Sequence, residues 1–104
     1  MKAIIEGKRY DTETAREIAS YSNGLGGGDF RNIEETLYRT KNGAFFLAGS
    51  GGAMTKYAEG NGNTTWGSSK IIPLSDADAL SWLENKANDP EAIEREFSNR
   101  IKDA

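Results

Sequence analysis

The chain has 104 residues, 37% of them hydrophobic, a formal net charge of −3, and neither cysteine nor histidine. This length fits one domain, residues 1–104, while the missing residue types exclude disulfides and zinc–thiolate sites and remove the commonest general base. No apolar run approaches the ~20 residues of a membrane span, and the N-terminus lacks a signal-peptide pattern, so we expect a cytoplasmic protein without membrane contact.

The acidic residues are concentrated in the last third of the chain. From Ser75 onward, eight acidic and four basic residues give a balance of −4, whereas residues 1–74 have a balance of +1. Such a segment forms either the solvated faces of helices or an acidic surface that meets a basic partner. The overall negative charge argues against a general nucleic-acid-binding protein, which is usually basic.

The first 30 residues predict a strand, a helix and a loop. Residues 2–11 begin as a short strand that stops or bends at Gly7. Asp11 or Thr12 can cap a helix that runs to about residue 22, in which the apolar side chains share one stripe. Four glycines between residues 24 and 28 then favour a surface loop, because glycine loses the most conformational freedom in regular structure.

A hairpin over residues 36–48 is the clearest predicted element. Its signal is Asn42-Gly43, because a type I′ turn needs positive φ at both positions. This turn would pair Tyr38 with Leu47 and place Phe45 on the same face. Large apolar side chains would also lie on the other face, so we expect the hairpin to lie in a sheet covered at least partly on both sides.

The second half of the chain predicts one strand and three helices. Residues 53–60 favour one or two helical turns, and residues 70–74 form a strand with a proline near its end, which is typical of a sheet edge. A capping box at Ser75 begins the next helix, and Asp89 with Pro90 begins the last. The last helix carries a narrow apolar seam formed by Ile93, Phe97 and Ile101.

These elements predict an α+β fold. An antiparallel sheet of about four strands, with the 36–48 hairpin at its centre, would pack with one N-terminal helix and two C-terminal helices.

The glycine-rich stretch 49–62 matches neither of two common phosphate-binding motifs. No glycine is followed by Lys-Ser or Lys-Thr, so a P-loop is excluded, and Met54 occupies the place of the last glycine of a dinucleotide fingerprint. The amides of Gly51, Gly52 and Ala53 could still face a small anion. The alternative is that these glycines serve only tight turning of the backbone.

No constellation for catalysis is apparent. Glu34 and Glu35 are adjacent on a strand and point to opposite faces, so they cannot share a proton. The serines have no histidine to activate them. We therefore expect a protein that is not an enzyme, with no catalytic residues, no metal site and no cofactor.

The aromatic and basic residues of the middle segment are candidates for a contact surface. Lys56, Tyr57, Trp66 and Lys70 lie in or beside the glycine-rich stretch, and exposed tryptophan and tyrosine commonly anchor protein interfaces. The alternative for Trp66 is a position over the sheet as a lid on the core.

The order of motifs resembles a family of small proteins from bacterial mobile elements and phages. The motifs are "KRYDTETA", "LYRTKNG", "GGAMTKYAE" and "IIPLS", and the resemblance covers about residues 3–84, without the last helix. Most such proteins have no assigned activity, and no catalytic residue carries over. Some members come from regions where anti-CRISPR proteins are found.

This resemblance implies a protein-binding inhibitor. It would dock on a Cas effector complex, of type I rather than Cas9, and block DNA binding or nuclease recruitment. An acidic patch could compete with DNA for a basic channel, and its candidate residues are Asp89, Glu91, Glu94 and Glu96.

Two alternatives to an inhibitor remain open. One is a DNA- or RNA-binding accessory or regulatory protein that uses a basic strip of Arg39, Lys41, Lys56 and Lys70 beside Tyr57 and Trp66. The other is a small anion-ligand binder at residues 49–57.

Overall fold

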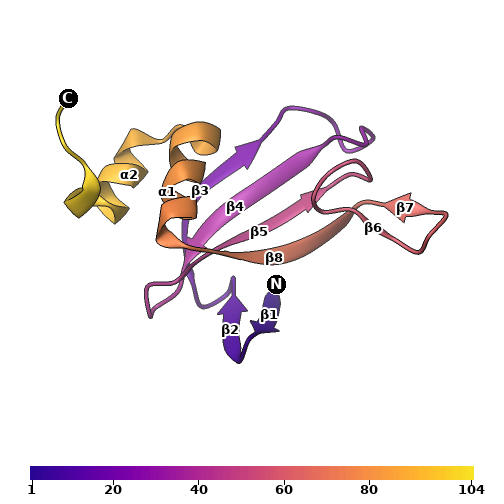
Figure 1. Cartoon of the computed structure of the whole chain (residues 1–104), viewed down its shortest axis with the longest axis horizontal. Helices are drawn as coiled ribbons and strands as arrows, with labels where there is room; N and C mark the ends of the chain where they lie inside the picture. Colours follow the sequence, from indigo (N-terminus) through magenta and orange to yellow (C-terminus); the bar gives the residue numbers. More distant parts are fainter.

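A four-stranded antiparallel sheet with the strand order β3-β4-β5-β8 organises the chain in the computed structural model, which describes residues 1–104 (Figure 1). Two small hairpins, β1–β2 and β6–β7, flank this sheet, and both helices follow the last strand. The elements are β1 (Lys2–Ile5), β2 (Lys8–Asp11), β3 (Arg16–Ser22), β4 (Ile33–Arg39), β5 (Phe45–Gly51), β6 (Glu59–Gly60), β7 (Thr65–Trp66), β8 (Ser68–Leu74), α1 (Asp76–Trp82), a π-helical turn (Leu83–Ala87), α2 (Pro90–Glu96) and a 3-10 turn (Ser98–Arg100).

The predicted N-terminal helix is absent, and the predicted α+β fold is therefore wrong: the chain is mostly β, with 38% strand and 21% helix. The Asp11 carboxylate accepts a hydrogen bond from the Glu13 amide, as a helix cap would, but the chain makes only one turn before β3 begins. A cap contributes only about 1 kcal/mol. Pairing of β3 with β4 satisfies a whole backbone ladder and buries Ile18, so it outweighs the local helical signal.

The predicted 36–48 hairpin is present, but its register is shifted by one residue. The Thr40 amide donates to the Ala44 carbonyl and the Gly43 amide to the Thr40 carbonyl, which closes a three-residue loop. Only Gly43 has positive φ in this turn, at 90°, so the type I′ turn was a wrong prediction. Tyr38 therefore pairs with Phe46, and the predicted pairing of Tyr38 with Leu47 is wrong.

The shift of register reassigns the faces of the sheet, because one residue moves every side chain to the opposite face. Phe45 and Leu47 lie with Leu37 in one buried cluster, and Tyr38 lies with Phe46 in another. The predicted grouping of Tyr38 with Phe45 and Leu47 is thus wrong. The expected positive φ at two consecutive residues occurs instead at Glu6 and Gly7, in the turn that joins β1 to β2.

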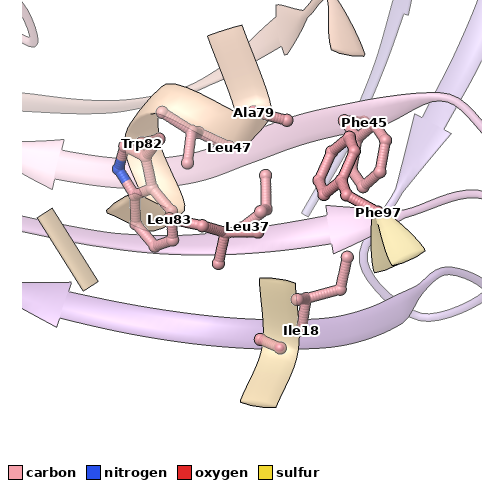
Figure 2. Packing of buried hydrophobic residues seen from close by; sticks show 9 residues of the cluster. Ile18, Leu37, Phe45, Leu47, Ala79, Trp82, Leu83 and Phe97 are labelled. Atoms are coloured by element: carbon pink, nitrogen blue, oxygen red, sulfur yellow. The ribbon is translucent and has the colours of Figure 1, made fainter. Parts of the chain in front are cut away.

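The larger cluster lies between the sheet and the helices (Figure 2). The Phe97 ring stacks on Phe45 with a centroid separation of 5.2 Å, which joins the end of α2 to the hairpin. Burying each large side chain stabilises the fold by about 1.5–3 kcal/mol. The nine buried members are Ile18, Leu37, Phe45, Leu47, Ala79, Trp82, Leu83, Ala92 and Phe97.

The smaller cluster lies on the other face, where the β1–β2 hairpin covers part of the sheet. Tyr10 of β2 meets Phe46 edge-on at 5.5 Å, and Tyr38 stacks on Phe46 at 5.3 Å. Ile71 completes the buried set. The expectation of a hairpin covered on both faces is therefore confirmed.

The predicted starts of the two C-terminal helices are confirmed. The Ser75 side chain accepts from the Asp78 amide, Asp89 accepts from the Ala92 amide, and Pro90 opens α2. The last helix ends at Glu96, earlier than its seam predicts, so Ile101 lies outside it and is 41% exposed. No helix of this chain has both the length and the apolarity to span a membrane.

Two predictions for residues 53–74 had different outcomes. Residues 53–58 contain turns and no helix, so the short helix was a wrong prediction. The strand near residues 70–74 is β8, an edge strand that contains Pro73, as expected. The β6–β7 hairpin projects at the end of the sheet far from the helices (Figure 1).

Candidate functional site

The glycines at 49–52 allow close backbone contact. A Cβ atom at Gly51 would collide with the Thr55 side chain, and one at Gly52 would collide with the Phe30 carbonyl. The Gly52 amide already donates to the Asn32 carbonyl at 2.9 Å. The candidate anion residues Gly51, Gly52 and Ala53 therefore join the end of β5 to the loop before β4, and the Gly52 N–H is not free for an anion.

Gly49 makes room for the next loop to fold back onto the sheet. A Cβ atom there would overlap the Tyr57 hydroxyl. Tyr57 is fully buried, so its ring presents no surface to a partner. The folded-back segment 52–58 instead brings Tyr57 to Glu35, a buried residue of β4.

Glu35 is the centre of a buried polar cluster. Its carboxylate accepts from the Tyr57 hydroxyl at 2.6 Å, from the Trp82 Nε1–H at 3.0 Å and from the Lys56 ammonium at 2.7 Å. The residue is only 3% exposed. A buried carboxylate is tolerated when charge-assisted hydrogen bonds satisfy it, and here three donors from two segments do so.

The same contacts set the protonation states of the cluster. Burial raises the pKa of Glu35, but the hydrogen bonds from Lys56, Tyr57 and Trp82 outweigh it and hold the pKa below its ordinary value. Burial and the adjacent Glu35 carboxylate raise the pKa of Tyr57. The carboxylate therefore stays charged and the phenol stays neutral at neutral pH, as their short hydrogen bond requires.

The structure separates one of the candidate contact residues of the middle segment, Trp66, from the other three. The ammonium groups of Lys56 and Lys70 lie 5.5 and 6.0 Å from the Tyr57 ring centroid, so these three side chains do gather. Trp66 lies on β7, is 43% exposed and belongs to neither buried cluster. The alternative of a lid over the core is therefore not seen for Trp66.

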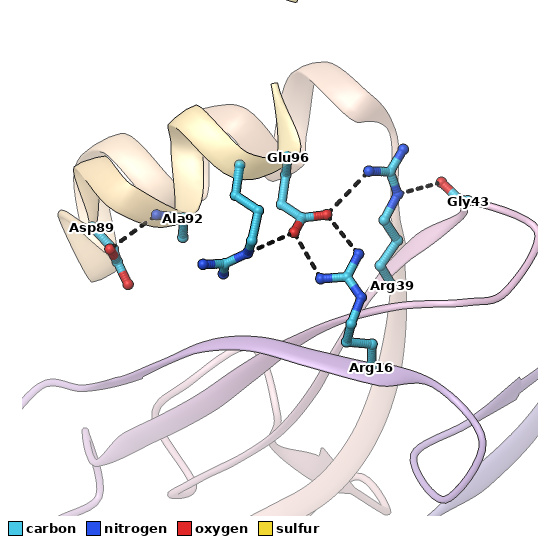
Figure 3. A network of polar contacts seen from close by, with 7 residues as sticks. Arg16, Arg39, Gly43, Asp89, Ala92 and Glu96 are labelled. Atoms are coloured by element: carbon cyan, nitrogen blue, oxygen red, sulfur yellow. Dashed lines mark hydrogen bonds and ion pairs between the residues drawn. The ribbon is translucent and has the colours of Figure 1, made fainter. Parts of the chain in front are cut away.

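Glu96 holds a second polar cluster (Figure 3). Its carboxylate binds Arg16 through two hydrogen bonds of 2.7 and 2.9 Å, and Arg39 and Arg95 at 3.1 Å each. The side chain is 1% exposed. The hydrogen bonds from Arg16, Arg39 and Arg95 lower the pKa of Glu96 to about 2, against the smaller effect of burial.

The predicted acidic patch is consequently divided. Glu96 is bound inside by arginines, and Asp89 caps α2 through the Ala92 amide. Glu91 and Glu94 are exposed and available to a partner. A continuous patch of four carboxylates is not present on the helix.

The predicted basic strip is divided as well. Arg39 and Lys41 lie at the turn between β4 and β5, whereas Lys70 pairs with Gly49 in the opposite half of β5. Gly49 is four residues along the strand from Phe45, the partner of Arg39, which corresponds to about 13 Å. Arg39 and Lys41 therefore do not form one strip with Lys56 and Lys70.

A group of exposed apolar side chains lies at the far end of the sheet, which we call the apolar end surface: Phe30, Met54 and Trp66. Their exposed fractions are 65%, 70% and 43%. The Met54 amide donates to the Phe30 carbonyl at 2.8 Å, and Phe30 and Trp66 line one shallow hollow of about 540 Å³. Sequence reasoning identified Trp66 as a candidate but missed Phe30 and Met54. The position of Phe30 as a lone aromatic residue in a glycine-rich polar loop could have indicated its exposure.

Comparisons of the chain with protein-family models, with curated proteins and with solved structures gave no match. The structure contains no group of three or more acidic side chains placed to hold a metal ion. The candidate site therefore stands on the geometry of the apolar end surface and the two polar clusters.

Proposed function

We propose that this chain is a non-enzymatic protein-binding inhibitor from a mobile element, and that the apolar end surface is its main contact. The observation that carries the proposal is the exposure of three large apolar side chains at one end of the sheet, where Phe30 and Trp66 line one hollow and the Met54 amide is bonded to the Phe30 carbonyl. Single exposed apolar residues are ordinary, whereas a contiguous group of them is typical of an interaction site.

The energy available from this surface is consistent with an anchor inside a larger interface. Full burial of a large apolar side chain contributes about 1.5–3 kcal/mol, and these three are roughly half exposed, so the group can contribute about 2–5 kcal/mol. Association costs at least about 4 kcal/mol in lost freedom. Polar contacts around the anchor are therefore needed, and the exposed Glu59, which pairs with Trp66 in the β6–β7 hairpin, could supply one.

The backbone beneath the surface is well connected. The Gly52 amide donates to the Asn32 carbonyl, and a Cβ atom at Gly67 would collide with the Gly51 carbonyl, so β5, β7 and the loop before β4 are in close contact. A surface ordered before binding loses less entropy on binding.

The two buried carboxylates support a role without catalysis. Each of Glu35 and Glu96 is fully engaged by side chains of the fold itself. Such saturated groups serve structure in this arrangement, and general acid–base work needs a group that can reach a substrate.

The partner class in this proposal follows the resemblance to phage and mobile-element proteins. We propose a Cas effector complex of type I in the host cytoplasm, with DNA binding or nuclease recruitment as the blocked step. The exposed Glu91 and Glu94 could add contacts to a basic groove of such a complex.

The test combines co-purification with a plaque assay. The tagged chain is incubated with type I effector complexes, and phage protection is scored in a host that carries the same system. The variant Phe30→Ser/Trp66→Ser should lose binding by at least tenfold, whereas a control with two exposed apolar residues changed elsewhere, Ile4→Ser/Ile101→Ser, should bind normally. Absence of any complex together with absence of phage protection would refute the inhibitor role, and equal binding by both variants would refute the surface.

A further inference from the structure

Two hollows lie on either side of the turn between β4 and β5, and basic side chains line both. Arg16, Arg39 and Lys41 line the first, of about 590 Å³, and Lys8, Arg9 and Lys41 line the second, of about 540 Å³. The hollows share the side chains at residues 14 and 40–42, so they form one surface. We call the five cations Lys8, Arg9, Arg16, Arg39 and Lys41 the hairpin-tip surface.

Charge is segregated on this surface. It holds five of the 13 Lys and Arg residues but only one of the 16 Asp and Glu residues, Asp11, among the lining residues. One Asp11 carboxylate oxygen accepts from the Glu13 amide, so this group is engaged in its own turn. In a chain of net charge −3, such a local excess is unexpected from composition.

The cations of the hairpin-tip surface are of two kinds. Arg16 and Arg39 are fixed by Glu96, and the Arg39 guanidinium also lies 4.6 Å above the Phe45 ring. Lys8, Arg9 and Lys41 take part in no ion pair. The surface therefore combines a rigid base with three exposed, uncompensated charges.

Glu96 does not cancel the charge of its surroundings. Its one negative charge faces three guanidinium groups, from Arg16, Arg39 and Arg95, which leaves a balance of +2 in that cluster. The carboxylate therefore positions the arginines while the positive field remains.

We propose that the hairpin-tip surface binds the phosphate backbone of a nucleic-acid duplex. Guanidinium and ammonium groups next to the Thr14 and Thr40 hydroxyls and the Asn42 amide are the side chains that contact phosphate and sugar oxygens. Two adjoining hollows suit successive phosphates of a backbone better than they suit one isolated phosphate ion. This inference is independent of the protein-binding surface, which lies at the other end of the sheet.

The duplex is favoured over a single strand by the absence of a stacking platform. Tyr10 is the one aromatic residue that lines these hollows, and it is 8% exposed. Binding of unpaired bases usually depends on exposed aromatic faces, whereas backbone binding depends on charge alone. The exposed Glu13 and Glu17, which flank Arg16 in the chain, will reduce the affinity without removing the local excess.

The experiment measures binding of a labelled 20-base-pair DNA duplex by fluorescence anisotropy between 25 and 200 mM salt. If all five cations neutralise phosphates, log K falls with log salt at a slope of about −4.5. The variant Lys8→Gln/Arg9→Gln/Lys41→Gln removes only the three unpaired cations. It should bind at least tenfold more weakly at low salt, and its plot of log K against log salt should be shallower by about 2.7.

A matched control makes the same change of net charge elsewhere. Lys70→Gln/Lys86→Gln/Lys102→Gln removes three exposed lysines outside the hollows and should weaken binding less than threefold. Circular dichroism melting verifies that both variants fold. If the first variant does not fold, the single variant Lys41→Gln, on the exposed turn, should still make the salt dependence shallower by about 0.9.

The outcomes separate the possible ligands. No binding of the duplex at 25 mM salt, or equal loss in the two triple variants, would overturn the proposal. Tighter binding of poly-glutamate than of the duplex would assign the surface to an acidic protein and overturn it as well. Inorganic phosphate should compete only weakly with the labelled duplex. If phosphate competes as well as unlabelled duplex does, the surface is a small-anion site and the proposal is overturned.

Discussion

Removing the charge of Glu35 should strongly destabilise the fold. In Glu35→Gln the side chain keeps its shape, but it can no longer accept hydrogen bonds from all of Tyr57, Trp82 and Lys56. Hydrogen bonds to a buried charge contribute about 1.5–3 kcal/mol each, and the half-exposed Lys56 counts for less because solvent screens it.

The expected loss for Glu35→Gln is about 2–4 kcal/mol of unfolding free energy. For a chain of this size, that corresponds to a fall in melting temperature of roughly 10–25 °C. Thermal and urea unfolding, followed by circular dichroism, measure it. The control is Glu34→Gln, which makes the same chemical change at the exposed neighbour and should alter stability by less than about 0.5 kcal/mol.

A double-mutant cycle with Tyr57→Phe tests the coupling directly. Because the Tyr57 hydroxyl is 2.6 Å from the Glu35 carboxylate, the two changes should be non-additive by at least about 1 kcal/mol. Equal melting temperatures for Glu35→Gln and Glu34→Gln would refute the view that this cluster anchors segment 52–58 and α1 to the sheet.

Three further predictions concern other parts of the molecule. The pKa of Glu96 is about 2 in the fold and about 4.5 when unperturbed, so its contribution is complete above pH 4.5 and is lost as pH falls toward 2; Glu96→Gln should flatten this acid dependence of stability in urea titrations. Gly49→Ala should cost about 1–3 kcal/mol, measured by urea unfolding, because its Cβ atom would overlap the fixed Tyr57 hydroxyl; an unchanged midpoint would contradict that packing. Trp66→Phe should shift tryptophan emission to the blue and lower acrylamide quenching, since the remaining Trp82 is 7% exposed; strong residual quenching would contradict that burial.

Capping residues predicted where the C-terminal helices begin, but local patterns did not reliably predict whether a segment forms a helix or a strand. Ser75, Asp89 and Pro90 act within one turn of their own position, so their roles can be read directly from neighbouring residues. Residues 12–22 carry a similar cap at Asp11, yet they form a turn followed by β3, because pairing with β4 decides the conformation of residues 16–22.

The candidate site was harder to predict than the fold, because its groups meet only through folding. Arg16 and Glu96 are 80 residues apart, and Trp82 and Glu35 are 47 apart. No spacing rule connects such pairs. The sequence predicts that Glu34 and Glu35 point to opposite faces of a strand, but it does not show which of the two is buried or which donors would meet it.

A central hairpin, an edge strand with Pro73 and two capped C-terminal helices could be predicted from the sequence, because short-range sterics and capping bonds specify these features. Tertiary structure decided the strand at residues 16–22, the register of the hairpin and the burial of Tyr57. These depend on which distant surfaces pack together, and the free energy of that packing exceeds the ~1 kcal/mol of any local preference.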